Sequence, residues 1–274
     1  MKTIRTQLKN DRHLSFKKYG AGKTTYLLLH GIPGSSHVWH TVASDLEKEG
    51  TTIFAPDLLG FGQSSRPASV SDLWLEAQAS AIAESIEQLG IECIHLVGHD
   101  YGGPISITLY QMIPQKIESL TILATNTFTD TPIPPPLAMI KLPFIGPLWE
   151  KVIFSKGSLK MMLRQGVGKT SQPIDVNSAI GDRSQVRSIA TIFSSALKEL
   201  SLRYRNVQDS LAKIQVPTTV IWGTKDPFFS IKQGERTTAA IPGAKFVLID
   251  GAGHFLPEER PIEIVAELKK RRII

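Results

Sequence analysis

The amino-acid sequence predicts an α/β fold with a mostly parallel central sheet, helices on both faces and an inserted helical cap. The first observation is that short apolar runs recur at helix-sized intervals, with amphipathic patterns between the early ones. Strand, helix and strand in repetition favour a parallel sheet that is covered on both faces. The second observation is that this alternation stops between about residues 127 and 213, which indicates an insertion.

The individual elements follow from the local pattern. An antiparallel pair of strands is expected near residues 3–19, with Asn10 and Asp11 at the turn. A long helix is expected over residues 71–90, with Gly90 placed to end it. Further strands are expected at 24–30, 51–57, 93–100, 119–126, 218–226 and 244–250.

Residues 127–213 interrupt the strand and helix alternation. The stretch "TDTPIPPPLAMIKLPFIGP" concentrates proline, and the rest carries short helical patterns without a buried strand. We therefore expect a core domain of residues 1–126 and 214–274, and a helical cap of residues 127–213 over the strand ends. Within this cap, "GVGKTS" (166–171) ends like a phosphate-binding loop, but Leu163 stands where that motif needs glycine. A nucleotide site is therefore not expected.

Composition narrows the possible classes of protein. Of the 274 residues, 42% are hydrophobic and 20% charged, which is the balance of a globular protein in water. The net charge of +6 comes from scattered basic residues, and the one basic run, 269–272, ends an amphipathic helical pattern, where cations are common. We expect no nucleic-acid or membrane partner. The single cysteine, Cys93, precludes an internal disulfide, and the N-terminus lacks a signal-peptide core, so we expect a cytoplasmic location.

The sequence "GHDYGG" has the spacing of a nucleophile elbow. Gly98, Gly102 and Gly103 flank Asp100 between an apolar run and a helical pattern. Such a turn holds its central residue in strained backbone geometry, and neighbours without bulk let the following helix pack closely. Asp100 is therefore the candidate nucleophile, although a glycine-rich loop at the end of a strand also fits the pattern.

A base and an orienting acid follow the elbow in the chain. Of the seven histidines, only His254 comes after Asp100, as the usual order of nucleophile, acid and histidine requires. Asp226, just past an expected strand, is the candidate acid, and an Asp-Pro turn former is its alternative explanation. Asp250 is nearer to His254 in sequence, but it ends a strand and is better suited to a structural role. Asp100, Asp226 and His254 together predict a catalytic triad.

These motifs make the chain resemble the α/β-hydrolase superfamily over essentially its full length. An aspartate in the elbow resembles the epoxide hydrolase and haloalkane dehalogenase branch, and the loop His30–Pro33 is similar to the HGxP loop of that branch. The resemblance implies an oxyanion hole made by the backbone N–H groups of Ile32 and Tyr101. We accordingly expect a small apolar organic substrate and water as partners, no cofactor, no metal, and a monomer or homodimer.

An aspartate nucleophile changes the chemistry that the site can perform. An ionised carboxylate attacks saturated carbon that carries a leaving group, which gives an alkyl-enzyme ester. His254, oriented by Asp226, then activates the water that hydrolyses this ester. Hydrolysis of an epoxide to a diol is the first expectation, and cleavage of a carbon–halogen bond is the alternative. A non-catalytic small-molecule binding protein on the same fold also stays open.

Aromatic residues distinguish these functions. Tyr204, the one tyrosine of the expected cap, lies in a Tyr-Arg-Asn run similar to the segment that carries a ring-opening tyrosine in epoxide hydrolases. A second cap phenol is missing, so Tyr101 is the remaining candidate donor. A solvent-exposed tyrosine on a helix is the alternative for Tyr204. Haloalkane dehalogenases usually carry tryptophan directly after the nucleophile, where this chain has Tyr101, so Trp149 and Trp39 are the candidate substrate contacts.

Overall fold

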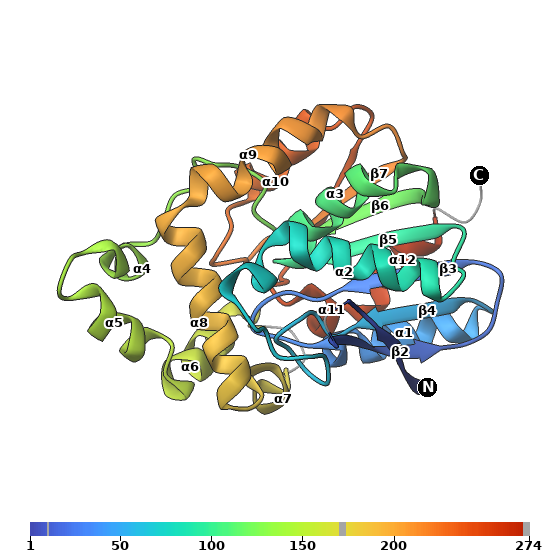
Figure 1. The fold of residues 1–274 in the computed structure, drawn as a ribbon. Helices are drawn as coiled ribbons and strands as arrows, with labels where there is room; N and C mark the ends of the chain where they lie inside the picture. The colour runs from blue at the N-terminus through green and yellow to red at the C-terminus, as the bar shows by residue number, and fades with distance from the viewer. Residues whose placement is uncertain (10, 170–173, 271–274) are drawn as a thin grey trace.

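The computed structural model describes residues 1–9, 11–169 and 174–270. At its centre lies an eight-stranded sheet with the order β1-β2-β4-β3-β5-β6-β7-β8 (Figure 1). β2 pairs antiparallel with β1 and with β4, and every other neighbouring pair is parallel. The mostly parallel sheet is therefore confirmed. Its strands are β1 (Lys2–Gln7), β2 (His13–Tyr19), β3 (Thr25–Leu29), β4 (Thr52–Pro56), β5 (Ile94–His99), β6 (Ile117–Leu123), β7 (Thr218–Gly223) and β8 (Lys245–Ile249).

Helices cover both faces of the sheet, as Figure 1 shows. Along β3, Leu27 and Leu29 pack in one hydrophobic cluster, while Tyr26 and Leu28 pack in the other. Because side chains alternate along a strand, a strand that is buried on both faces is apolar throughout. One cluster includes residues of α2 (Leu75–Gln88) and α3 (Gly102–Met112), and the other includes residues of α1 (His40–Lys48), α11 (Leu256–Glu259) and α12 (Pro261–Lys269). α10 (Ile231–Ala240) packs against β7 and β8.

One of the expected elements differs in detail from the structure. The helix expected over 71–90 is divided into the 3-10 turn η2 (Val70–Leu73) and α2, because Trp74 between them is extended at ψ 159°. Asp72 and Ser69 form a capping box that fixes the start of η2 as a separate turn. Gly90 follows α2 with a φ of +62°, as expected of a residue that ends a helix. The N-terminal hairpin is present, although Asn10 of its turn lies outside the described residues.

Residues 127–213 form what we call the β6–β7 segment. The described part of this segment contains helices and no strand. Its last two long helices, α8 and α9, lie beside the end of the sheet at which β5 stops (Figure 1). The helices are α4 (Pro135–Ala138), α5 (Gly146–Ile153), α6 (Lys156–Gly166), α7 (Val176–Ile180), α8 (Arg183–Lys198) and α9 (Leu200–Ser210).

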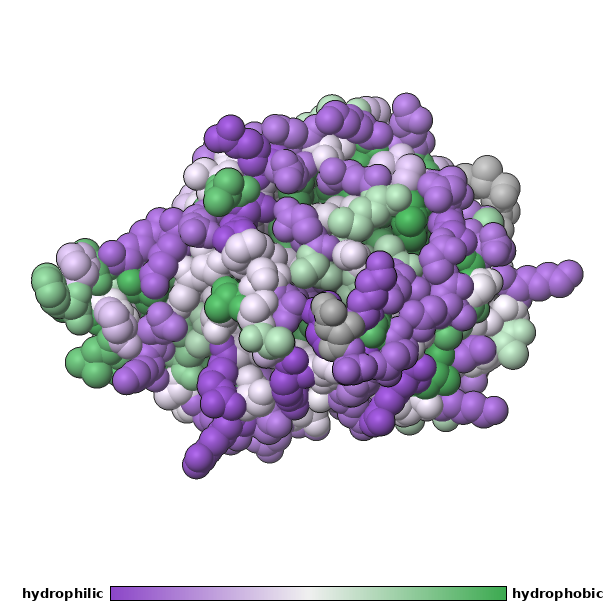
Figure 2. Space-filling model, in the orientation of Figure 1, coloured by the Kyte–Doolittle hydropathy of each residue, from purple (hydrophilic) through white to green (hydrophobic). Residues whose placement is uncertain are grey.

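The outer part of the β6–β7 segment exposes large apolar side chains. Phe144 is 97% exposed and Leu148 69%, and Figure 2 shows hydrophobic atoms at this edge of the molecule. Leu163 and Ile189, by contrast, are fully buried in α6 and α8. The segment is therefore packed most tightly where it approaches the sheet.

The remaining expectations concern the tail and possible membrane contact. Lys269 pairs with Glu49 at 2.7 Å and Lys270 with Glu267 at 2.5 Å, while Arg271 and Arg272 lie outside the described residues. Throughout the described ranges, no helix is both long enough and apolar enough to span a bilayer.

Candidate active site

Asp100 occupies a tight turn between β5 and α3. Its φ of +49° lies in the left-handed region, which is uncommon for any residue other than glycine. The turn is fixed by its backbone, because the Asp100 N–H donates to the Leu123 carbonyl at 3.1 Å and its own carbonyl accepts from the Gly103 N–H at 3.0 Å. A Cβ atom at Gly102 would lie 2.3 Å from the Leu29 carbonyl oxygen, so a side chain there would push α3 away from β3. The glycines of "GHDYGG" thus have the packing role expected of an elbow.

The loop after β3 approaches the Asp100 carboxylate from the other side. The Ile32 N–H donates to Asp100 Oδ1 at 2.7 Å. A Cβ atom at Gly31 would lie 2.4 Å from the Cβ of Asp100, which explains the glycine in this loop. The second expected oxyanion donor, the Tyr101 N–H, follows Asp100 directly at the start of α3.

His254 lies between the carboxylates of Asp100 and Asp226. His254 Nε2 lies 3.5 Å from Asp100 Oδ2, and His254 Nδ1 lies 2.9 Å from Asp226 Oδ2. The other Asp226 oxygen accepts the N–H groups of Phe228 and Phe229 at 2.8 and 3.0 Å, which orients the carboxylate toward the imidazole. The structure thus brings together the three residues predicted to act as a triad.

Asp250, the other acid near His254 in sequence, does not contribute to this arrangement. Its Oδ1 accepts the hydroxyl of Thr224 at 3.0 Å, and the residue is exposed at the end of β8. The geometry therefore agrees with the structural role expected for Asp250.

The electrostatics favour an ion pair between Asp100 and His254. Burial disfavours charge on the imidazole, but the Asp226 charge and hydrogen bonds to Asp100 and Asp226 outweigh it and raise the pKa of His254 to about 10. Burial likewise opposes ionisation of Asp100, but the hydrogen bond and charge of His254 dominate and lower the pKa of Asp100. His99 is different, because burial and the neighbouring His254 lower its pKa to about 4. These shifts favour a carboxylate at Asp100, an imidazolium at His254 and a neutral imidazole at His99.

The loop that carries His254 is held by a buried carboxylate that the sequence reasoning missed. Glu259 is 2% exposed, and its Oε2 accepts the N–H groups of Gly253 and Gly168, each at 2.8 Å. Its Oε1 accepts the Phe255 N–H at 2.8 Å. Gly168 belongs to "GVGKTS", of which Thr170 and Ser171 lie outside the described residues. The described glycines of that motif thus pack against the histidine loop.

A cavity of about 70 Å³ opens above Asp100. A single water needs a cavity of about 10–15 Å³, so this cavity has room for a small organic group. The cavity lies between the sheet end and helices α8 and α9, and most of its lining is apolar. Its lining residues are Ile32, Asp100, Tyr101, Asn126, Ile192, Phe193, Ala196, Tyr204 and Phe229.

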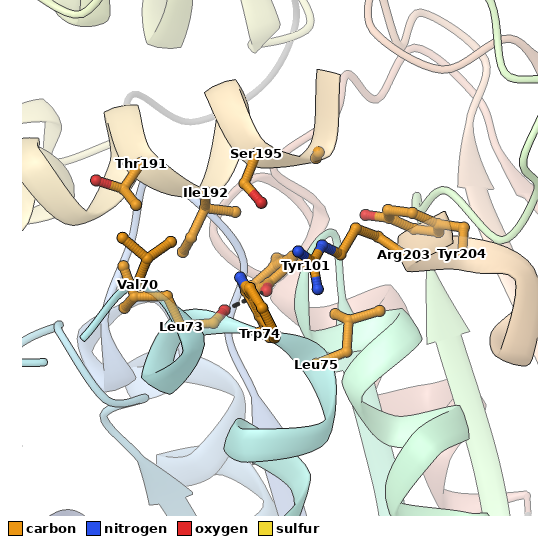
Figure 3. Close-up of a pocket in the computed structure, with 11 residues that line it drawn as sticks. Val70, Leu73, Trp74, Leu75, Tyr101, Thr191, Ile192, Ser195, Arg203 and Tyr204 are labelled. Carbon is orange, nitrogen blue, oxygen red and sulfur yellow. Dashed lines mark hydrogen bonds between the residues drawn. The ribbon is translucent and has the colours of Figure 1, made fainter. Parts of the chain in front are cut away.

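Tyr204 and Tyr101 line this cavity in different ways. Tyr204, on α9, is buried at 7% exposure and lines the cavity together with Asn126. Burial and the negative charge of Asp100 raise the pKa of Tyr204, so its hydroxyl keeps its proton. The Tyr101 hydroxyl, in contrast, donates to the Leu73 carbonyl at 2.6 Å (Figure 3). Tyr101 is therefore not placed as a second donor through its phenol.

Asn126 is a cavity residue that the sequence reasoning did not single out. It follows β6, so its position just past the carboxyl end of a parallel strand was the available signal. Its side-chain oxygen accepts the Phe128 N–H at 3.1 Å and the Thr131 hydroxyl. Its amide nitrogen donates to the Phe128 carbonyl at 3.1 Å, which holds the side chain beside Tyr204.

The two tryptophans expected to contact substrate lie elsewhere. Trp39 is fully buried in the hydrophobic cluster on the side of the sheet covered by α1. Trp149 is on α5, where its indole N–H donates to the Pro136 carbonyl at 2.8 Å, and Figure 1 places α5 at the outer edge of the molecule. Neither is among the described residues that line the cavity. The structure therefore does not support a substrate-binding role for either residue.

Comparison with known proteins agrees with this geometry at the level of the family. The model of the α/β hydrolase fold family matches residues 27–261. Because the match spans well over half of the chain, the protein belongs to the α/β hydrolase fold family. The fold and the family together define a hydrolase.

The relatives of this chain are named for different activities. An uncharacterised protein of Mycobacterium bovis is 26% identical over 268 residues, covering 92% of this chain and 75% of its own length. Lipase 3 of Moraxella sp. is 27% identical over 233 residues, covering 83% and 70%. Epoxide hydrolase 4 of Mus musculus is 24% identical over 260 residues, covering 88% and 70%. The relatives therefore leave the substrate class open.

Solved structures show the same fold. The epoxide hydrolase CorEH is similar with a TM-score of 0.79 and 21% identity, over 98% of this chain and 97% of that one. A putative ancestral haloalkane dehalogenase, AncHLD2, is similar with a TM-score of 0.80 and 21% identity, over 98% and 100%. At this level of identity the likeness concerns the fold alone.

Proposed function

We propose that the protein hydrolyses epoxides to diols through an alkyl-enzyme ester on Asp100. The observation that carries this proposal is the pairing of an ionised carboxylate and a protonated phenol, Asp100 and Tyr204, across one small apolar cavity. The carboxylate supplies a nucleophile for saturated carbon, and the phenol supplies a proton to the oxygen that leaves it. His254 and Asp226 supply the base for the second step.

In the first step, Asp100 Oδ2 bonds to an epoxide carbon while the ring C–O bond breaks. The electron pair moves to the ring oxygen, which takes the proton of the Tyr204 hydroxyl. The negative charge of Asp100 is one cause of the raised pKa of Tyr204. Because ester formation removes that charge, the phenol becomes a better acid as the alkoxide develops.

Ester formation also converts His254 from an acid into a base. Its pKa is raised partly by the charge of Asp100 and the hydrogen bond to it, and both are lost when Asp100 is esterified. Burial then favours the neutral form of His254. The imidazolium therefore gives its proton to the Tyr204 phenolate, which restores the Tyr204 hydroxyl. His254 next takes a proton from water, and the hydroxide attacks Cγ of Asp100.

The tetrahedral intermediate carries negative charge on Oδ1. The Ile32 N–H already lies 2.7 Å from that atom, and we assign the Tyr101 N–H as the second donor. Collapse breaks the ester C–O bond, and the proton of the new carboxyl group passes to the departing diol oxygen. Asp100 and the imidazolium of His254 are restored.

Halide release is the second candidate, and the cavity supports it less well. A departing halide needs free N–H donors, and among the described lining residues there is no tryptophan. The Ile32 N–H is engaged by Asp100, and the Asn126 amide donates to the Phe128 carbonyl. An epoxide needs one O–H donor instead, and Tyr204 is available for that role.

We further propose that residues 127–213 act as a cap domain over the core of residues 1–126 and 214–274. Ile192, Phe193, Ala196 and Tyr204 of this segment form the wall of the cavity that faces Asp100. Such a wall excludes bulk water, which strengthens electrostatic interactions inside the site. On this proposal the substrate class is set by the cap and the nucleophilic chemistry by the core.

The test is a panel of epoxides and bromoalkanes, assayed for diol and for halide. We expect diol formation by the wild type and none by Asp100→Asn, because an amide is a poor nucleophile. His254→Gln is expected to complete the first step only, which would appear as a mass increase on the peptide that contains Asp100. Asp250→Asn serves as the matched control, because that carboxylate bonds to Thr224 and not to His254. Diol formation by Asp100→Asn at the wild-type rate, or halide release without epoxide turnover, would overturn the proposal.

A further inference from the structure

A second, smaller cavity of about 20 Å³ adjoins the one above Asp100. Tyr101, Ile192, Ala196 and Tyr204 line both cavities, so the two are separated only by shared side chains. The volume suffices for one water-sized group, such as an oxygen atom at the end of a substrate. Figure 3 shows this second cavity between η2, the start of α2, and helices α8 and α9.

Two buried donors in this cavity have no acceptor. Arg203 Nε and Trp74 Nε1 are both buried, and neither has a hydrogen-bond partner among the described residues, so an acceptor reaches them when the side chains that line the cavity move apart. Arginine Nε–H and indole N–H groups donate only, so no rearrangement of protons satisfies them. A buried donor without a partner is unfavourable, and an ordered water or a ligand that supplies an acceptor would relieve it.

The two donors are held rigidly and near one another. The Arg203 guanidinium lies 3.4 Å over the Trp74 ring, and Figure 3 shows both side chains directed toward the middle of the cavity. A terminal nitrogen of Arg203 also pairs with Glu199, the residue that precedes α9. This stacking and pairing fix the guanidinium, so little side-chain entropy is lost when Nε–H meets an acceptor.

The other acceptors of the cavity lining are neutral hydroxyl groups, among them those of Thr191 and Ser195, and these are weaker acceptors than a carboxylate. Val70, Leu73, Leu75 and Ile192 contribute apolar side chains. The Tyr101 hydroxyl donates to the Leu73 carbonyl, so it is already engaged. Glu199 pairs with a terminal nitrogen of the guanidinium and is 45% exposed, so solvent screens its charge.

We propose that this cavity is a subsite for an acceptor oxygen, which Arg203 Nε–H and Trp74 Nε1–H bind together. The ligand is an apolar chain that ends in a carboxylate or a carbonyl oxygen. In a substrate, the chain runs from the carbon that faces Asp100, past Tyr101 and Tyr204, to this oxygen. This last statement rests on the proposed function, whereas the binding of the oxygen does not.

The test observes binding directly, without turnover. In a protein labelled with ¹⁵N, the indole N–H of Trp74 gives one NMR signal, which Trp74→Phe identifies by removing it. The probes are hexanoate, methyl butyl ketone and, as the apolar control, toluene. Hexanoate or the ketone is expected to shift the Trp74 indole proton downfield, as a new hydrogen bond does, and toluene is expected not to. The Trp222 indole, which donates to the Phe229 carbonyl at 3.0 Å, is an internal reference expected to stay in place.

Variants of α9 test the guanidinium. Arg203→Met is expected to weaken binding of the oxygenated probe roughly tenfold, the equivalent of one hydrogen bond to a charged group. Arg203→Lys keeps the charge and the helix but lacks the Nε–H, so it covers the case in which the methionine variant fails to fold. Arg205→Met, at an exposed position on the same helix, is the matched control and is expected to bind like the wild type.

The outcomes separate this proposal from the proposed function. Loss of the Trp74 shift in Arg203→Lys, with the shift kept in Arg205→Met, supports the subsite even if no epoxide is hydrolysed. Equal shifts with toluene and the oxygenated probes, or unchanged affinity in both Arg203 variants, would overturn the subsite even if diol is formed.

Discussion

Replacement of the buried Glu259 tests how the histidine loop is held in place. The carboxylate accepts three backbone N–H groups, from Phe255 through Oε1 and from Gly253 and Gly168 through Oε2. In Glu259→Gln one oxygen becomes an NH₂ group, which cannot accept. The least costly orientation keeps the amide oxygen toward the two glycines and leaves the Phe255 N–H without an acceptor.

The expected loss of unfolding free energy follows from the number of N–H donors that lose their acceptor. One buried N–H without an acceptor costs about 1–3 kcal/mol, so Glu259→Gln is expected to lower the free energy of unfolding by about that amount. Glu259→Ala leaves all three donors unpaired, and the expected loss is on the order of three times larger. Because Gly253 and Phe255 flank His254, we also expect slower ester hydrolysis in the glutamine variant.

The assay is urea unfolding, with the free energies of the two variants compared with that of the wild type. Glu263→Gln is the matched control, because that side chain is 47% exposed and a surface substitution changes stability by about 0.5 kcal/mol or less. An unfolding free energy of Glu259→Gln that equals the control, or losses of equal size in Glu259→Gln and Glu259→Ala, would refute the reasoning.

Three further predictions concern the proposed catalytic groups. Asp226→Asn is expected to slow ester hydrolysis by on the order of 10⁴-fold, because its NH₂ group faces His254 Nδ1 and selects the wrong tautomer; single-turnover kinetics that match the wild type would contradict this. The raised pKa of His254 means that its ion pair stabilises the folded state fully below pH 6.5 and is lost as pH rises toward about 10. The stability advantage of the wild type over His254→Gln should therefore shrink across that window in thermal unfolding, and a constant difference would exclude the ion pair. Tyr204→Phe is expected to slow formation of the Asp100 ester from epoxides by roughly 10²–10⁴-fold and to leave any bromoalkane turnover nearly intact, with rapid quench as the measurement.

The sheet was predictable because its strands are buried on both faces. A strand such as β5, with every residue buried, has no polar side chains other than those of His95 and His99, and it is bounded by the turns that end it. The division of the helix expected over 71–90 was not predictable in the same way. It depends on the extended backbone at Trp74, and the apolar pattern alone continues through that residue.

The positions of the proposed triad were accessible to sequence reasoning because each follows a strand of the sheet. Parallel strands end at one edge, so Asp100 after β5 and Asp226 after β7 had to lie at the same end. Contacts made across the β6–β7 segment were not accessible in this way. Trp149 and Tyr204 both belong to that segment, yet only Tyr204 lines the cavity, because α5 and α9 lie on different sides of it. The bond from the Tyr101 hydroxyl to Leu73 likewise depends on how η2 meets α3.

The relatives have different named activities, so they do not identify the substrate. The proposed nucleophile, Asp100, limits the kind of carbon that can be attacked. A serine elbow must first lose a proton before its oxygen can attack a carbonyl carbon, so a neutral histidine is needed in the first step. Here the effect of burial is outweighed by the charge of Asp226 and the hydrogen bonds to Asp100 and Asp226, which raise the pKa of His254 and favour the imidazolium. Such a group cannot remove a proton at neutral pH, whereas an aspartate nucleophile needs none removed. On the proposed mechanism, the raised pKa of His254 suits attack by Asp100 on saturated carbon, and the base would be generated only after Asp100 has given up its charge to the ester.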